Sequence, residues 1–120
     1  MNVVVYIASP YSGYADKRAA VAAQIDAFAA LLEMGFEPIA PLLAHYVEEH
    51  YPTAYERWLQ WGMALVERCD LVLRLPGESG GADREVARAI ELGKPVVYGI
   101  EELQALMQPP VDCGALEVQS

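Results

Sequence analysis

Short apolar runs alternating with helical periodicity are the feature that most constrains the fold of this chain. The runs are continuous and rich in β-branched residues, as in parallel strands covered on both faces. They occupy residues 3–8, 36–40, 71–75 and 96–98. Helical patterns follow at residues 15–34, 55–68, 83–93 and 101–107. This order predicts an α/β fold, a three-layer, doubly wound parallel sheet of flavodoxin-like or Rossmann-like type.

The expected strand order is 2-1-3-4, with the change of direction between strands 1 and 3. The loops that follow Ala8 and Leu75 then face each other, at the edge where open α/β sheets bind ligands. Residues 116–118 predict either a short fifth edge strand or a tail that docks on a partner. The 120 residues are expected to form a single domain, with residues 109–120 as its tail.

The segment from residue 76 to residue 95 carries the first candidate site. Gly80 and Gly81 predict a loop after the third strand, and the helical pattern begins at Asp83 and ends before Gly93. Its expected apolar face consists of Val86, Ala89, Ile90 and Gly93. Glu85 lies at the edge of that face in the first turn, where a carboxylate or a bound phosphate is favoured. The alternative is an ordinary first-turn acid, with Ser79 as a turn residue.

A second group of polar residues follows the first strand. Ser9, Tyr11, Ser12 and Gly13 belong to a loop rich in hydroxyls and phenols, which suits a sugar or a phosphate. An ordinary turn explains the same residues equally well. The strand order brings this loop and Tyr6 next to the glycine loop of the third strand. A small-molecule site is therefore expected between them.

Residues 42–55 carry histidines and acids in the order H-x-x-E-E-H. The two histidines are five residues apart, which does not suit a shared helical face, so no metal site is expected. His45 is instead a candidate donor to a base or a sugar. The next helix is unusually apolar around Trp58 and Trp61, which indicates either core packing or contact with another subunit.

The net charge of −9 argues against nucleic acid and anionic membranes as partners, but local donors still permit a small anionic ligand. No signal peptide and no apolar run long enough to span a bilayer is recognised. The isolated Cys69 and Cys113 suit a reducing compartment, so a cytoplasmic protein is expected. No cofactor is expected.

Three stretches in order resemble the nucleoside 2-deoxyribosyltransferase-like superfamily, which includes the 2′-deoxynucleoside 5′-monophosphate N-glycosidases. They are VYIASPYS, CDLVLRLPG and S-x-G-x-x-x-E-x-x-x-A-x-x-x-G-K-P-V, and the resemblance spans residues 3–98. It implies that Glu85 is the nucleophile and that Tyr6 contacts it. It further implies that Ser79 binds a phosphate and that Gly81 lets the backbone approach the ligand. A homodimer or larger oligomer is implied, in which the neighbour's C-terminal region helps to close the site.

The implied chemistry is attack of a carboxylate on C1′ of the deoxyribose, which forms a glycosyl-enzyme that water or a second base resolves. The departing base takes a proton from a second acid. The chain departs from the family here, because Gly62 stands where an aspartate is usual. Glu56 is nearby in sequence but about 1.5 helical turns away. The basic residue usual after the first-strand loop is also absent, and Ser12 stands there.

Three hypotheses follow. The favoured one is hydrolysis or transfer at the N-glycosidic bond of a nucleoside or nucleoside 5′-monophosphate. The second is a non-catalytic domain that binds a nucleotide or nucleotide-sugar. The third is a flavodoxin-like electron carrier, indicated faintly by Ser9, Ser12 and Gly13, in a chain that is short and lacks a second flavin loop.

Overall fold

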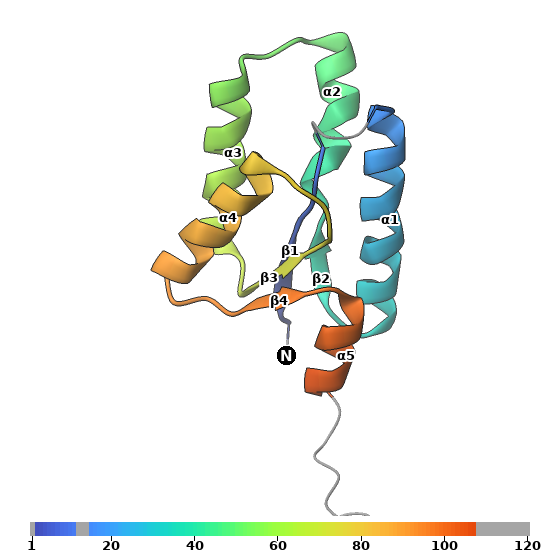
Figure 1. Cartoon of the computed structure of the whole chain (residues 1–120), viewed down its shortest axis with the longest axis vertical. Helices are drawn as coiled ribbons and strands as arrows, with labels where there is room; N and C mark the ends of the chain where they lie inside the picture. Colours follow the sequence, from blue (N-terminus) through green and yellow to red (C-terminus); the bar gives the residue numbers. More distant parts are fainter. Residues whose placement is uncertain (1, 12–14, 108–120) are drawn as a thin grey trace, which may run out of the picture.

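A parallel sheet forms the centre of the molecule (Figure 1). The computed structural model describes residues 2–11 and 15–107. Within them the strands are β1 (Val4–Ala8), β2 (Glu37–Ile39), β3 (Leu71–Arg74) and β4 (Val96–Tyr98). All neighbours pair in parallel in the order β2-β1-β3-β4, which confirms the predicted order. The expected fifth strand at 116–118 and the tail at 109–120 lie outside the described residues.

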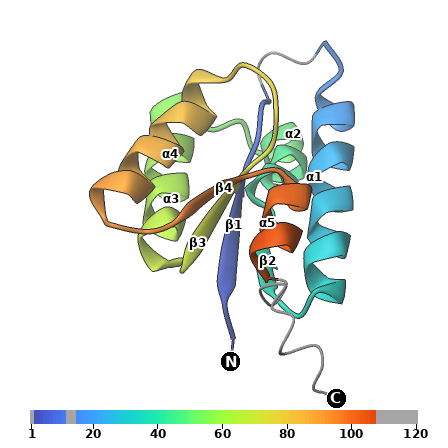
Figure 2. The ribbon, with the colours of Figure 1, turned by 60° about the horizontal axis from the view of Figure 1, so that its bottom comes forward.

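Helices cover both faces of the sheet (Figure 2). The helices α1 (Lys17–Glu33) and α5 (Ile100–Met107) lie on one face, and α3 (Tyr55–Arg68) and α4 (Gly80–Glu91) lie on the other. Along β1, Val5 and Ile7 pack toward α1 and α5, while Tyr6 and Ala8 pack toward α3 and α4. Side chains of a strand point alternately to opposite faces, so a continuous apolar run is what a doubly covered strand requires. The three-layer prediction is therefore confirmed.

The segment between β2 and α3 forms two short helical pieces beside α1 (Figure 1). They are the 3-10 helix η1 (Pro41–Ala44) and the α-helix α2 (His45–His50). They follow the carboxyl end of β2, so they stand at the edge of the sheet where the loops after β1 and β3 also emerge. This placement adds a further wall at the predicted ligand edge.

The start of α4 differs from the prediction. The helix begins at Gly80, not at Asp83, because Ser79 is its N-cap and its Oγ accepts a hydrogen bond of 3.1 Å from the amide of Ala82. A serine at this position satisfies a free amide, so the helix starts even with glycines in its first turn. Gly80 and Gly81 are therefore helical residues, and Glu85 lies in the second turn.

The buried faces of two helices differ from what their apolar residues indicate. On α1, Ile25 and Leu32 are 44% and 51% exposed, whereas Gln24 is fully buried. The expected apolar face of α4 included Ile90, which is 62% exposed. Both helices bury alanines beside larger apolar side chains, and on α1 the buried Gln24 also donates to the carbonyl of Ile7 in β1. No helix in the described part of the chain is long and apolar enough to cross a membrane.

Candidate functional site

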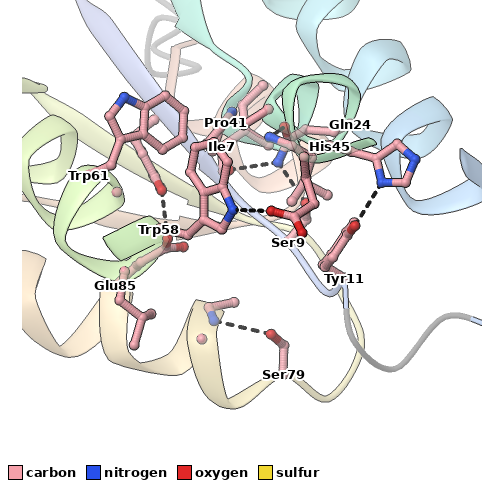
Figure 3. A pocket seen from close by; sticks show the side chains of 18 of the residues that line it. Ile7, Ser9, Tyr11, Gln24, Pro41, His45, Trp58, Trp61, Ser79 and Glu85 are labelled. Atoms are coloured by element: carbon pink, nitrogen blue, oxygen red, sulfur yellow. Dashed lines mark hydrogen bonds between the residues drawn. The ribbon is translucent and has the colours of Figure 1, made fainter. Parts of the chain in front are cut away.

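A cavity of about 340 Å³ lies at the carboxyl end of β1 and β3, walled by η1, α2, α3 and α4 (Figure 3). Seven of the predicted site residues line it, namely Tyr6, Ser9, Tyr11, His45, Ser79, Gly81 and Glu85. Gly80 is not among the lining residues, since it is the exposed first residue of α4. Ser12 and Gly13 lie outside the described residues.

The loops after β1 and β3 pack directly on each other, as the switch point in the strand order predicts. Gly77 has a φ of +118°, and a Cβ added to it would lie 2.6 Å from Cγ of Pro10. The amide of Leu75 donates to the carbonyl of Ala8 at 2.9 Å. Only glycine combines this backbone conformation with so close an approach. The contact brings the two loops together at one side of the cavity.

Tyr6 and Glu85 form a hydrogen-bonded pair in the wall of the cavity. The phenol of Tyr6, on a fully buried residue of β1, donates to Oε2 of Glu85 at 2.6 Å. Burial raises the pKa of Glu85 to about 7, although the Tyr6 hydrogen bond and the charge of Arg74 act in the opposite direction. Burial, followed by the negative charge of Glu85, raises the pKa of Tyr6. The phenol therefore stays protonated, while the carboxyl group titrates near neutral pH.

Gly62 lets the backbone of α3 lie against this pair. A Cβ added at Gly62 would lie 3.1 Å from Oε2 of Glu85 and 3.1 Å from the phenol oxygen of Tyr6. A side chain at this position therefore needs both groups to move. Glu56, the other acid of α3 considered from the sequence, is exposed and does not line the cavity.

Arg74 holds the β3–α4 loop in place, a role that the sequence reading missed. It is 8% exposed and donates to the carbonyls of Leu75 and Gly77, the latter at 2.8 Å, and to Oδ1 of Asp83 at 3.1 Å. A buried arginine is expected to be paired in this way. The sequence signal was a charged residue inside an apolar strand, at the end nearest the ligand edge.

Gln24 joins three segments near the cavity and was also missed. Its amide nitrogen donates to the carbonyl of Ile7 at 2.9 Å and to Oγ of Ser9 at 2.8 Å. Its oxygen accepts from the amide of Leu42 at 2.8 Å. The side chain thereby ties α1 to the end of β1 and to η1. A polar residue among the apolar positions of a helix was the available signal.

His45 lies on the opposite side of the cavity from Glu85 (Figure 3). Its Nδ1 is 2.7 Å from the phenol oxygen of Tyr11, and its Nε2 is 2.9 Å from Oε2 of Glu49. Glu49 in turn forms an ion pair with Arg18 at 3.0 Å. Both ring nitrogens therefore have protein partners. The described residues contain no group of three or more His, Cys, Asp or Glu side chains placed to hold a metal ion.

Glu48 and the two tryptophans complete the wall formed by α2 and α3. Glu48 accepts hydrogen bonds from Nε1 of Trp58 at 2.7 Å and from the amide of Thr53 at 2.9 Å. These bonds lower the pKa of Glu48, so it is ionised at neutral pH. Trp58 and Trp61 are half-buried, with ring centroids 5.6 Å apart, and both line the cavity. The sequence had indicated only a core or a subunit contact for them.

Known proteins resemble this chain in family and in fold. The model of the family described as "Domain of unknown function (DUF7768)" matches residues 3–99, whereas no curated protein matches significantly. The solved structure of a 2-desoxiribosyltransferase from Leishmania mexicana is similar, with a TM-score of 0.60 and 20% identity. The match covers 80% of this chain and 63% of that one, so this chain spans less than two thirds of the solved protein. The two share the fold, and the match to the family model over most of the sequence shows that this chain belongs to the DUF7768 family.

Proposed function

We propose that this protein cleaves or transfers at the N-glycosidic bond of a nucleoside or nucleoside 5′-monophosphate, with Glu85 as the nucleophile. The observation that carries the proposal is the Tyr6–Glu85 pair, a partly buried carboxylate in the wall of a half-open cavity at the ligand edge of the sheet. A cavity of about 340 Å³ falls within the range of sites for small molecules.

The hydrogen bond from Tyr6 holds Oε2 of Glu85, which leaves Oε1 as the attacking atom. Oε1 forms a bond to C1′ of the sugar as the bond from C1′ to the base nitrogen breaks, and the base departs with that electron pair. Water or a second base then attacks C1′, the bond from C1′ to Oε1 breaks, and the proton lost by the attacking molecule balances the one that the departed base takes up. The first product is free base, and the second is either the free sugar or a new nucleoside.

The side of the cavity formed by α3, η1 and the loop after β1 suits a planar base. Trp58, Trp61 and Tyr11 present aromatic surface, and Leu42 and Pro41 add aliphatic surface nearby. Aromatic side chains stack on bases of every type. Each stacked base contributes about 1–3 kcal/mol to binding in complexes with single-stranded nucleic acid. The base is therefore assigned to this side and the sugar to the side of Tyr6, Ser79 and Glu85.

The departing base has no acid at position 62 to protonate it, because Gly62 brings only backbone to this place. Glu48, the other carboxylate in the lining, is ionised and cannot serve as the donor at neutral pH. We therefore expect rates to depend steeply on how readily the base leaves without protonation.

The similarity to a structure named as a 2-desoxiribosyltransferase supports the same reaction class. It does so only through the fold, since identity is 20% and the match covers 63% of that chain. The resemblance of the loops after β1 and β3 to the nucleoside 2-deoxyribosyltransferase-like superfamily supports it independently.

The test is release of free base from 2′-deoxynucleosides and their 5′-monophosphates, followed by chromatography. We expect release by the native protein and a loss of about 1,000-fold in Glu85→Gln, which keeps the shape of the side chain but removes the nucleophile. Glu56→Gln is the matched control, because it removes an exposed carboxylate outside the cavity. Undiminished release by Glu85→Gln would refute the role of Glu85.

A second candidate function is binding of a nucleotide or nucleotide-sugar without reaction. Gly62 favours it, since the site lacks the acid that this chemistry usually employs. Calorimetric binding of nucleosides, with no base released across pH 5–9, would support this function in place of the first.

We further propose that the protein forms a homodimer or larger oligomer. Large apolar side chains of η1, α2 and the start of α3 are exposed, namely Leu43, Val47, Tyr51 and Tyr55. They lie on the elements that wall the cavity, so a neighbour seated there also shields the site. Size-exclusion chromatography with light scattering would show a monomer if this is wrong.

A further inference from the structure

None of the basic side chains of this chain lines the cavity. The chain has eight lysines and arginines, and all of them lie within the described residues. They are Lys17, Arg18, Arg57, Arg68, Arg74, Arg84, Arg88 and Lys94. The residues that line the cavity include none of these eight. A bound phosphate therefore finds no cationic side chain in the described wall.

The basic groups nearest the cavity already have protein partners. Arg18 forms its ion pair with Glu49. The Nζ of Lys17 lies over the ring of Tyr11, 5.3 Å from the ring centroid. Arg74 donates to two carbonyls and to Asp83. Recruiting any of them to a phosphate means breaking contacts that organise the surrounding loops.

Two carboxylates line the same cavity. Glu48 is held by Trp58 and Thr53, and Glu85 is held by Tyr6. A nucleoside 5′-monophosphate carries about −1.5 to −2 charge at neutral pH, by analogy with other phosphate monoesters. Like charges in a partly enclosed site repel more strongly than in water. The electrostatics of the cavity therefore oppose a nucleotide.

The helix start of α4 is the feature that attracts an anion, and one of its first amides is already occupied by Ser79. The amide of Ala82 donates to Oγ of Ser79, and the amide of Asp83 donates to the carbonyl of Ser79 at 3.0 Å. Asp83 also lies in this first turn, and its carboxylate forms an ion pair with Arg74 at 3.1 Å. Ser79, which the family resemblance assigns to phosphate, therefore acts here as a helix cap.

We infer that this site selects nucleosides that are uncharged or carry a cationic base, and that it rejects their 5′-monophosphates, with Glu48 as the main discriminating charge. This inference rests on the proposed function for the reaction, and it names the substrate class within it. It contradicts the role in phosphate binding that the family resemblance implies for Ser79. Glu48 also offers acceptor oxygens to amino groups of a base, since its two protein donors leave lone pairs unused.

The test compares kcat/KM for each common 2′-deoxynucleoside with its 5′-monophosphate at low salt. We expect the nucleoside to be favoured at least 10-fold, and 0.5 M NaCl to reduce the preference, because salt screens the repulsion. Equal or greater kcat/KM for the monophosphates would overturn the inference.

Glu48→Gln removes the charge of Glu48 but keeps its hydrogen bond, because the amide oxygen still accepts from Trp58. We expect it to reduce the preference at least 3-fold, whereas Glu56→Gln, which removes the same charge outside the cavity, leaves it unchanged. An unchanged preference in Glu48→Gln would overturn the assignment of Glu48. Should that variant unfold, as judged by circular dichroism, the salt dependence of the native protein decides: no dependence overturns the electrostatic explanation.

Binding affinities measured by calorimetry test the preference for nucleosides separately from the proposed reaction. In Glu85→Gln, which binds without turnover, we expect the nucleoside to bind more tightly than its monophosphate. If base is never released but the nucleoside still binds more tightly, the proposed reaction is wrong and the preference for nucleosides is supported. If the monophosphate binds as tightly or more tightly, or neither compound binds, the selection is wrong.

Discussion

Two walls of the cavity differ in how their polar groups are held. The acid wall consists of Tyr6, Ser79 and Glu85, carried by β1 and α4, and the helical wall consists of His45, Glu48 and Trp58, carried by α2 and α3 (Figure 3). On the helical wall both nitrogens of His45 have partners and Glu48 accepts two hydrogen bonds. On the acid wall, burial raises the pKa of Glu85 to about 7.

This difference indicates a division of labour. Groups that protein hydrogen bonds hold in place fix a shape and recognise a ligand, whereas a carboxyl group with a raised pKa is suited to reaction. The sheet and the 12-residue α4 hold the acid wall, while on the helical wall Trp58 of the 14-residue α3 is bonded to Glu48 of the six-residue α2. Substitutions in the acid wall should therefore lower kcat, and substitutions in the helical wall should mainly raise KM.

Among the tests of this division of labour, the largest effect is expected for Tyr6→Phe on the acid wall. It removes the 2.6 Å hydrogen bond to Glu85, and we expect kcat for base release to fall about 100-fold, equivalent to about 2.7 kcal/mol. That bond lowers the pKa of Glu85, so the rise of kcat with pH should also move to higher pH. His45→Ala is the counterpart on the helical wall, with an effect mainly on KM. Similar effects of both variants on kcat would contradict the division of labour.

Next in size is the dependence of stability on the charge of Glu85. Its pKa rises from 4.5 in the unfolded chain to about 7 in the folded one, so between these pH values the folded state retains a proton that the unfolded state loses. This contribution to stability is complete below pH 4.5 and is lost as the pH rises to 7. We expect Glu85→Gln to be more stable than the native protein at pH 8 by about 2 kcal/mol, after allowance for partial exposure.

Urea denaturation of both proteins at pH 5 and pH 8 measures this difference. The same comparison for Glu48→Gln should show no such gain at pH 8, because hydrogen bonds lower the pKa of Glu48. A stability difference between Glu85→Gln and the native protein that does not change with pH would show that Glu85 is not perturbed by burial.

A smaller effect is expected for Gly62→Ala, where the two walls meet. The added methyl group lies 3.1 Å from both Oε2 of Glu85 and the phenol of Tyr6, so it displaces the pair. We expect kcat to fall about 10-fold. Stability should change little, since alanine favours the helix by about 1 kcal/mol and the crowding opposes it. Ala64→Gly, elsewhere on α3, is the control for helix propensity, and loss of activity there as well would remove the special role of position 62.

The smallest expected effect is that of Ser79→Ala, which removes the cap of α4. We expect a loss of about 1 kcal/mol in the free energy of unfolding, since Ser79 Oγ no longer accepts from the amide of Ala82. If Ser79 is a cap and not a phosphate ligand, the preference between nucleoside and monophosphate should not change. Ser79→Asp, which also caps helices, should restore stability. A selective loss of monophosphate turnover in Ser79→Ala would assign Ser79 to phosphate.

The sheet and the place of the site were predictable from the sequence. Continuous apolar runs separated by helical patterns have few arrangements available, so strand order and the meeting of the loops after Ala8 and Leu75 followed from local pattern and topology. Glu85 was singled out from its position after a serine and two glycines; it lines the cavity, and its role as nucleophile stays a prediction. The start of its helix was placed three residues late, because the capping bond of Ser79 was not anticipated.

Only the tertiary structure decided which polar groups meet. The Tyr6–Glu85 bond joins residues 79 positions apart, and Gln24 and Leu42 are 18 apart. Local periodicity carries no information about which of these widely separated residues meet, because such contacts depend on how helices pack on the sheet. The same holds for Gly62, which the sequence showed as a missing acid and the packing shows as the place where a helix backbone lies against the acid pair. The sequence determined the scaffold, since burial of apolar runs is a local pattern, and the packed fold determined the charge and hydrogen bonding of the cavity.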